Sequence, residues 1–331
     1  MKKVTILAPH NTMATTIFGP MDILNQAGRL WNQVHGLPKA PFFDVSIASA
    51  DGQPIRSVNN VFIQPHLGIE DVIQTDLIII SSATYIDQIL EKAPKVTDWL
   101  RLHYNEGTHI ASICTGVFLL AETGLLDGKT ATLHWGFTDM FRRRYPKVRL
   151  EQERIFIDHG SLYCSAGVSA GLDLCLYLVE KYCGKRIAVE SAKTMVLDMG
   201  RLSQNPYGSL TLRKDHGDAL VGKIQDWIEA NGSQDIDYDW LANEFGVSLR
   251  SMERRFRRSV GVTPLGYLHK VRVEKAKLLL EEGKLNFTEI TFEVGYEDVP
   301  FFRKIFFRHT GLKPYEYRNK FSGYSVRGSQ G

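Results

Sequence analysis

Short apolar runs alternate with segments of helical periodicity along residues 1–200. The runs are rich in β-branched residues and bounded by polar or glycine-containing turns, which predicts buried strands, and the periodic segments predict helices between them. This alternation predicts a mostly parallel α/β sheet with helices on both faces. We expect strands at 4–8, 43–50, 76–82, 109–113, 154–159 and 161–165, and helices at 16–27, 85–106, 115–123, 137–145 and 171–182.

The pattern changes after residue 200. Residues 201–217 are polar, contain Pro206 and two glycines, and show no periodicity, so we expect a linker there. Helical periodicity continues through residues 218–321, and the small polar residues 322–331 predict a disordered tail. The chain of 331 residues is therefore expected to form an α/β domain at 1–200 and an all-α domain at 218–321.

The helical part contains an internal repeat with an offset of 50 residues. The letters GVTP at 261–264 match GLKP at 311–314, and Tyr267 matches Tyr317. Each copy predicts two helices joined by a glycine-containing turn. The helix pairs are expected at 238–245 with 249–259 and at 287–294 with 299–309.

The second helix of each pair has the features of a DNA-reading helix. Ser248 and Asp298 are suited to cap it, and Asn286 with Glu289 predicts a capping box in the second copy. A helix–turn–helix unit can place its second helix in the major groove of DNA. The alternative is a helical bundle with solvated basic faces, but two basic copies in register favour DNA binding.

Charge and composition bear on this hypothesis. The chain carries 40 Lys and Arg against 37 Asp and Glu, a formal net charge of +3, but the basic residues are concentrated at 249–259 and 301–320. Specific DNA binding needs such a local basic surface, not a basic total. No apolar run reaches the roughly 18 residues of a membrane-spanning helix. The four cysteines contain no C-x-x-C pair, so we expect a cytoplasmic protein without metal or cofactor.

The letters VGYEDVPFFRKIFFRHTGLKPYEYR at 294–318 resemble the DNA-binding domain of the AraC/XylS family, and the resemblance covers residues 218–321. It implies two recognition helices on one face of double-stranded promoter DNA, spaced by the helix 264–282, with RNA polymerase as a partner. Pro300 departs from the polar residues common at its place, which predicts weaker base reading by the second helix. The implied base contacts are Arg250, Ser251, Glu253, Arg254, Val299, Pro300, Arg303 and Lys304, and the implied phosphate contacts are Arg257, Arg258, Arg308 and Lys320.

A nucleophile elbow is predicted at Cys114, where a strand is followed at once by a helix. Ser112 and Gly116 are the small neighbours that so tight a turn requires. The thiol would lie at a helix N-terminus, whose partial positive charge lowers the pKa of a cysteine. His134 is a candidate base. The plainer alternatives are that Cys114 is a packed residue of the turn and that His134 makes only a structural hydrogen bond.

The letters ASICTGVFLLAETGLLDGKTATLHW at 111–135 resemble the PfpI-like branch of the class I glutamine amidotransferase superfamily, over residues 3–195. This resemblance implies a flavodoxin-like fold, and together with the AraC-type domain it indicates a GlxA-type transcriptional regulator. Enzymes of the superfamily place a carboxylate after the first strand, a position that falls near Thr15 here. No Asp or Glu occurs between Met1 and Pro20, and Thr115 follows Cys114 where some peptidase-like members have His.

We therefore expect a homodimeric transcriptional activator without catalytic residues, because nucleophilic catalysis needs an activated nucleophile and an oriented base. The resemblance suggests an amino acid or amine as effector. Two alternatives stay open: a cysteine-dependent hydrolase or amidase attached to a DNA-binding domain, and a redox sensor that uses Cys114. The candidate effector pocket, at the carboxyl edge of the sheet, comprises His10, Asn11, Thr15, Cys114, Thr115 and His134.

Overall fold

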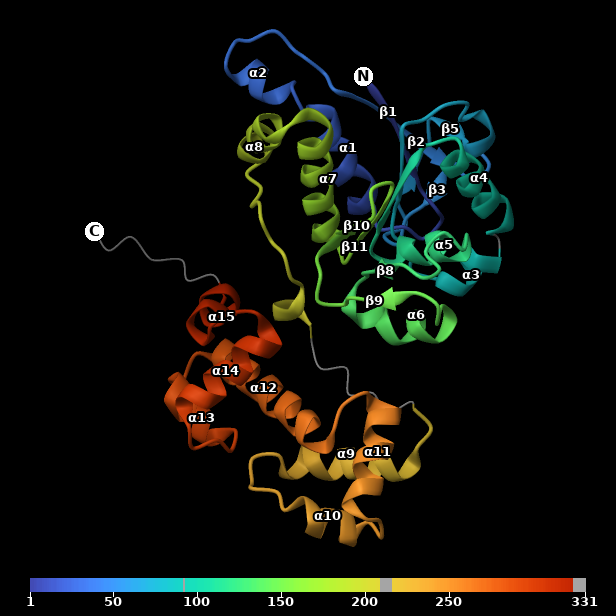
Figure 1. Ribbon diagram of the computed structural model, residues 1–331. Coiled ribbons are helices and arrows are strands. Elements are labelled where there is room, and N and C mark those ends of the chain that lie inside the picture. The colour runs from blue at the N-terminus through green and yellow to red at the C-terminus, as the bar shows by residue number, and fades with distance from the viewer. Residues whose placement is uncertain (92, 209–215, 324–331) are drawn as a thin grey trace, which may run out of the picture. The chain divides into compact units, whose positions relative to one another are not determined.

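The computed structural model describes residues 1–91, 93–208 and 216–323 (Figure 1). Its contacts divide the chain into two compact units, Met1–Gln204 and Asn205–Gly331. The first residues of the expected linker 201–217 belong to the first unit, where the Gln204 side chain donates a hydrogen bond to the Leu133 carbonyl (2.9 Å). Residues 209–215 of that linker, and all but the first two residues of the expected tail 322–331, lie outside the described residues.

The first unit is built, within the described residues, on a seven-stranded sheet with the order β10-β11-β7-β6-β1-β2-β5. The neighbouring strands are parallel except β10 and β11, which are antiparallel and correspond to the strands expected at 154–159 and 161–165. The predicted flavodoxin-like sheet is thereby confirmed. Its strands are β1 (Lys2–Leu7), β2 (Phe43–Ser49), β5 (Leu67–Gly68), β6 (Leu77–Ile80), β7 (His109–Ile113), β10 (Phe156–Asp158) and β11 (Leu162–Ser165); short pairs are formed by β3 (Ile55–Arg56) with β4 (Phe62–Ile63) and by β8 (Thr130–Ala131) with β9 (Arg149–Leu150).

Helices cover both faces of this sheet (Figure 1). Successive residues of a strand point to opposite faces, so Ile6 enters the core beneath α1 and α7, and Leu7 enters the core beneath α4 and α5. The helices of this unit are α1 (Thr15–Gln26), α2 (Leu30–Val34), α3 (Ile86–Glu91), α4 (Pro94–Asn105), α5 (Val117–Glu122), α6 (Thr138–Arg144), α7 (Val168–Cys183) and α8 (Lys185–Thr194).

The helix predictions differ from the structure in several places, and the short helix α2, for example, was not predicted. The single helix expected at 85–106 is two helices, α3 and α4, because Pro94 cannot donate a backbone hydrogen bond and instead begins α4. Helix α8 was not predicted, although its buried residues Ile187, Ala188, Ser191 and Ala192 follow helical spacing. Among the described residues, no helix combines the length and apolar character needed to cross a membrane, and no group of His, Cys, Asp and Glu could hold a metal ion.

The second unit is helical over its described residues. Both predicted helix–turn–helix pairs are present, α10 with α11 and α13 with α14, and Gly246 and Gly295 adopt the expected positive φ in their turns (68° and 91°). Ser248 and Asp298 cap the second helix of each pair through their side chains. The helices are α9 (Ala219–Asn231), α10 (Tyr238–Glu244), α11 (Leu249–Val260), α12 (Pro264–Glu282), α13 (Phe287–Glu293), α14 (Val299–Thr310) and α15 (Pro314–Phe321).

The turn after β7 brings the backbone into close contact with the end of β6. A Cβ atom at Gly116 would lie 2.6 Å from the Ile80 carbonyl oxygen and 2.7 Å from that of Ser81. Both neighbours are backbone atoms of a buried strand end, so they cannot move away cheaply. Glycine at this position is therefore required by packing, as the small-residue pattern predicted.

Replacing Gly116 by alanine should lower the free energy of unfolding of the first unit by about 1–3 kcal/mol, the usual cost of overpacking. Gly222→Ala is the control, because Gly222 lies in α9 with nothing within 4 Å of the added Cβ. That variant should stabilise the second unit by up to about 1 kcal/mol through helix propensity. Urea denaturation measures both changes, and a neutral Gly116→Ala would contradict the packing argument.

Candidate DNA-binding surface and effector pocket

Helix α11 is strongly two-sided. Met252, Phe256 and Ser259 are buried on one side, where they hold the helix against the rest of the first helix–turn–helix pair. The other side is exposed and basic, which is the arrangement that a recognition helix needs. Of the predicted contacts, Ser251 and Glu253 are half-buried and Arg250, Arg254, Arg257 and Arg258 are exposed.

Arg255 is the exception among the arginines of α11. Its guanidinium group donates two hydrogen bonds to the carboxylate of Asp218, from Nε to Oδ2 (2.9 Å) and from Nη2 to Oδ1 (2.7 Å). These bonds hold the pKa of the Asp218 carboxyl below its ordinary value. Asp218 is also the N-cap of α9. Arg255 therefore fastens α11 to the start of α9, whereas Arg250, Arg254, Arg257 and Arg258 are exposed.

Helix α14 has the same design with a more apolar surface. Phe302, Ile305 and Phe306 are buried, and Arg303 extends over the Phe287 ring, with 5.8 Å between guanidinium carbon and ring centroid. Phe301 and Phe307 are about half exposed beside these cations, and they are surface residues that the sequence reasoning missed. Of the predicted contacts on α14 and α15, Val299 is half-buried and Pro300, Arg303, Lys304, Arg308 and Lys320 are exposed.

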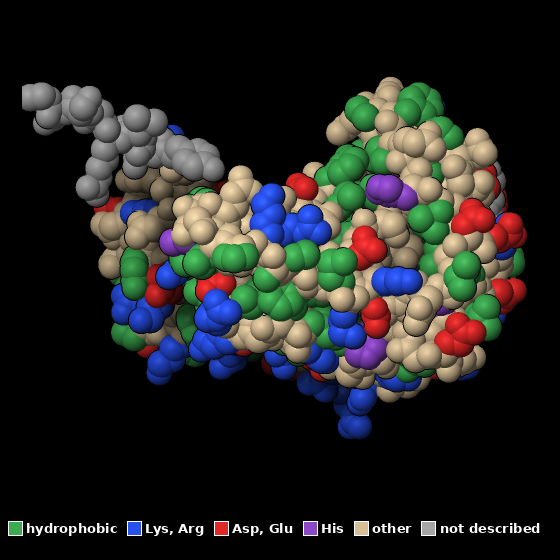
Figure 2. Space-filling model, turned by 90° about the horizontal axis from the view of Figure 1, so that it is seen from above, with side chains coloured by type: hydrophobic (Ala, Val, Ile, Leu, Met, Phe, Trp, Pro, Cys, Tyr) green, Lys and Arg blue, Asp and Glu red, His purple; other side chains and the backbone are tan. Residues whose placement is uncertain are grey.

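The basic character of these two helices is local. Figure 2 shows one face of the molecule, on which lysine and arginine side chains lie among apolar and acidic ones. This mixture agrees with the net charge of +3. DNA binding is thus supported by the exposed cations of α11 and α14 and does not require a basic molecule.

The predicted nucleophile elbow has the expected backbone geometry. Cys114 follows β7 and has a φ of 56°, in the left-handed region that side chains rarely adopt. The Thr115 hydroxyl donates to the Ala83 carbonyl (2.5 Å) and accepts from the Ala83 amide (2.8 Å), so it is used to hold the turn against the loop after β6. Thr115 is therefore placed as a structural residue of the elbow.

The expected low pKa of the Cys114 thiol is wrong. Burial raises the pKa of this thiol to about 11, and hydrogen bonds from the backbone of Thr115 and His134 offset only part of the rise. A thiol with this pKa is protonated at neutral pH, and the thiolate is the reactive form. Removal from water thus outweighs the favourable field of the following helix.

His134 does not supply the missing activation. Its Nδ1 accepts a hydrogen bond from the Gly136 amide (3.2 Å), and its ring lies against Trp135 with centroids 5.1 Å apart. Burial lowers the pKa of His134, so the imidazole is neutral at pH 7. Among the described residues, no hydrogen bond joins the His134 ring to the Cys114 sulfur. These contacts match the alternative in which His134 makes only a structural hydrogen bond.

The position near Thr15, where the resemblance places the carboxylate of enzymatic members, carries a hydroxyl. Thr15 is exposed at the start of α1, whereas the next residue, Thr16, is buried and lies 3.1 Å from the Ser82 hydroxyl. Ser82 precedes Ala83, which holds Thr115. Thr16 is therefore the threonine at the start of α1 that contacts the loop after β6.

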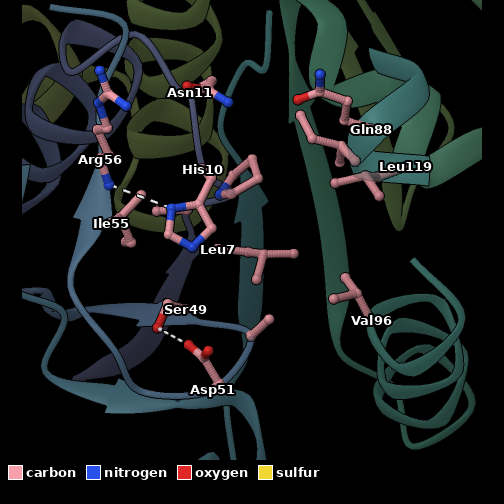
Figure 3. A pocket seen from close by; sticks show the side chains of 14 residues that line it. Leu7, His10, Asn11, Ser49, Asp51, Ile55, Arg56, Gln88, Val96 and Leu119 are labelled. Atoms are coloured by element: carbon pink, nitrogen blue, oxygen red, sulfur yellow. Dashed lines mark hydrogen bonds between the residues drawn. The ribbon is translucent and has the colours of Figure 1, made fainter. Parts of the chain in front are cut away.

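A cavity of about 420 Å³ opens at the carboxyl edge of the sheet, beyond the ends of β1 and β2. His10 and Asn11 line it as expected, but Thr15, Cys114, Thr115 and His134 are not among its lining residues. Figure 3 shows His10 and Asp51 on one side of the cavity and Gln88, Val96 and Leu119 on the other. The remaining lining residues are Leu7, Ala8, Pro9, Ser49, Ala50, Ile55, Arg56 and Ile89.

Comparisons with known proteins agree with both units. Residues 2–181 match the DJ-1/PfpI family, and residues 241–320 match a helix-turn-helix domain. The HTH-type transcriptional regulator CdhR of Pseudomonas aeruginosa is 30% identical over 83% of this chain and 80% of its own. The HTH-type transcriptional regulator GlxA of Rhizobium meliloti is 25% identical over 68% and 72%. The crystal structure of Drosophila melanogaster DJ-1beta has a TM-score of 0.51, is 20% identical, and covers 60% of this chain and 98% of its own.

The two units together define a transcriptional regulator in which an α/β ligand-sensing domain is joined to an AraC-type DNA-binding domain. The chain belongs to the DJ-1/PfpI family, and within that family it is similar to the regulators that carry this second domain. The predicted family and the predicted class of DNA-binding transcriptional regulator are thereby confirmed.

Arg254→Ala should cost about 1–3 kcal/mol of binding to the preferred DNA sequence and relax the preference at one base position. Arg258→Ala should weaken binding to preferred and random DNA by the same factor, because a phosphate contact carries no sequence information. Fluorescence anisotropy with both DNAs measures these effects. Equal losses on both DNAs for Arg254→Ala would contradict its assignment.

Alkylation of Cys114 by iodoacetamide should be slow at pH 7 and should rise about tenfold per pH unit toward pH 11, because only the thiolate reacts and its pKa is about 11. Mass spectrometry of the Cys114 peptide separates this reaction from that of the other cysteines. A labelling midpoint at or below pH 8 would contradict the raised pKa and support an activated Cys114 thiol.

Proposed function

We propose that this protein is an effector-responsive activator that binds promoter DNA as a homodimer in the cytoplasm and recruits RNA polymerase. The observation that carries the proposal is the cavity at the carboxyl edge of the first unit. Open α/β sheets bind ligands at this edge, and 420 Å³ lies within the usual size of a small-molecule site. The cytoplasmic location follows from the DNA target of the second unit.

The lining of the cavity suits a small amino acid or a similar amine. His10 Nδ1 accepts a hydrogen bond from the Arg56 backbone amide (3.4 Å), which leaves its Nε2–H as a donor. The Asp51 carboxylate accepts from the Gln53 amide (3.1 Å) through Oδ1, and among the described residues Oδ2 has no hydrogen bond. The free Asp51 oxygen would accept a hydrogen bond from the ammonium group of an amino acid, and His10 Nε2–H would donate one to its carboxylate. Aliphatic side chains such as Ile89 and Leu119 suit an apolar body.

The effector would act by population shift. Binding in the cavity changes DNA affinity only if the ligand binds two arrangements of the DNA-binding domains unequally. We infer that the segment 201–217 carries this coupling. Its first end is held in the first unit by Gln204, and Tyr207 lies within the second unit under the Lys320 ammonium (5.0 Å from the ring centroid). Only Asn205 and Pro206 separate these two anchored residues, so a displacement of Gln204 would be passed directly to Tyr207.

The protonated state of Cys114 counts against both thiol-based alternatives. A hydrolase and a peroxide sensor each need a thiolate, and at pH 7 about one thiol in ten thousand with a pKa of about 11 is ionised. The hydroxyl at Thr16 offers no base. We therefore assign the elbow a structural role and place effector binding in the neighbouring cavity.

A thermal-shift screen with the common amino acids and small amines should raise the melting temperature of the first unit for at least one compound. Asp51→Asn should then weaken that compound about tenfold or more, because a charge-assisted hydrogen bond is lost. Ile89→Trp should abolish the shift by filling the cavity.

Cys114→Ser and His134→Asn are the controls, since neither side chain lines the cavity, and both should keep the full thermal shift. If Cys114→Ser removes the shift and Asp51→Asn preserves it, the effector binds at the elbow and the cavity assignment is wrong.

A further inference from the structure

The two helix–turn–helix pairs of the second unit have separate apolar cores. One core gathers residues of α9, α10 and α11, and the other gathers residues of α13, α14 and α15. Helix α12 serves both, because Tyr267 and Leu268 enter the first core and Val273, Ala276 and Leu280 enter the second. Apolar packing therefore fixes each pair on α12 but gives the two pairs no common core.

Polar contacts join the two pairs at the middle of α12. Arg272 is buried, with 7% of its surface exposed. It donates from Nε to the Gly232 carbonyl (2.7 Å) and from Nη2 to the Gln234 carbonyl (2.8 Å), in the loop between α9 and α10. Its guanidinium carbon lies 4.6 Å from the ring centroid of Tyr296, in the turn between α13 and α14. One side chain thus holds a loop of the first pair and the turn of the second.

Lys275, one helical turn further along α12, makes the same connection. Its Nζ donates to the Ser233 hydroxyl (3.0 Å) in the first pair and to the carbonyl (3.0 Å) and carboxylate (2.9 Å) of Glu293 in the second. The turn of the second pair also touches the loop directly. A Cβ atom at Gly295 would lie 2.4 Å from the Ser233 carbonyl oxygen, so only glycine permits this approach.

We propose that this polar junction, formed by Arg272, Lys275, the loop 232–234 and the turn Gly295–Tyr296, sets the DNA spacing that the protein accepts between its two binding elements. The proposal rests on DNA reading by α11 and α14 and is independent of the effector. Without the junction the two recognition helices are related only by α12 and by side-chain packing on either side of it. With the junction, the loop of one pair is fastened to the turn that precedes the recognition helix of the other.

The spacing requirement follows from DNA geometry. One base pair more or less between the two elements moves the second by about 3.4 Å along the helix axis and turns it by roughly 35°. A rigid pair of recognition helices cannot follow such a change, whereas a pair hinged on α12 can follow part of it. The junction would therefore control spacing and leave the bases read by each helix unchanged.

The test begins with selection of DNA from a random double-stranded library by the full-length protein, which defines the two enriched elements and their spacing. Affinity is then measured for that duplex and for duplexes with one base pair inserted or deleted between the elements. The wild-type protein should bind the altered duplexes about tenfold more weakly, the usual loss for a disrupted contact.

Arg272→Met and Lys275→Met should reduce that discrimination to about threefold or less while selecting the same two elements. Arg318→Met is the matched control, because Arg318 donates to the Leu285 carbonyl within the second pair alone and should retain the tenfold discrimination. Circular dichroism establishes folding of each variant.

Two results would overturn the proposal. One is full spacing discrimination in folded Arg272→Met and Lys275→Met proteins. The other is loss of helical structure in both variants, which would make the junction a requirement for folding and not a spacer.

Discussion

Burial of both faces of a parallel sheet is the constraint on which the first unit depends. Strands such as β6 are buried along their whole length, so polar groups are confined to the places where strands end. His10 follows β1, Asp51 follows β2 and Cys114 follows β7, and all three lie at the carboxyl edge. The three residues differ in their access to solvent. Cys114 is buried against the core, whereas His10 and Asp51 line an open cavity.

The second unit is held together by two small apolar cores, one for each helix–turn–helix pair. Exposed cations lie on one side of α11 and of α14, so only the other side of each helix is available for packing. The ion pair of Arg255 with Asp218 adds to the apolar packing of α11, and Phe302 and Phe306 anchor α14 through an aromatic cluster. Polar contacts of Arg272 connect the two helix–turn–helix pairs, whose apolar cores remain separate.

Features determined by local sequence could be predicted, and features determined by distant neighbours could not. The caps Ser248 and Asp298 and the positive φ of Gly246 depend on nearby residues, so the helix–turn–helix pairs were found almost to the residue. The pKa of Cys114 depends on burial by other elements, and the helix N-terminus alone gave the wrong direction. On a helix one residue turns the side chain by about 100°, which is why Thr15 is exposed where Thr16 is buried.

The cavity shows the same limit. His10 and Asn11 were found because they follow a strand, but Asp51, Gln88 and Val96 come from three further elements whose meeting no spacing reveals. Likewise, the junction joins residues about 40 positions apart, such as Gly232 and Arg272. Only the folded chain brings them together.

The local placement of basic charge on α11 and α14 has a consequence for how the protein searches a chromosome. At physiological ionic strength the Debye screening length is about 8 Å, so a distant charge contributes little to attraction. Residues 249–259 and 301–320 together carry a formal charge of +9, so the rest of the chain sums to −6 and does not attract DNA. Encounters in which the exposed arginines do not face the phosphates should therefore end quickly, and those in which they do should last long enough for the bases to be read.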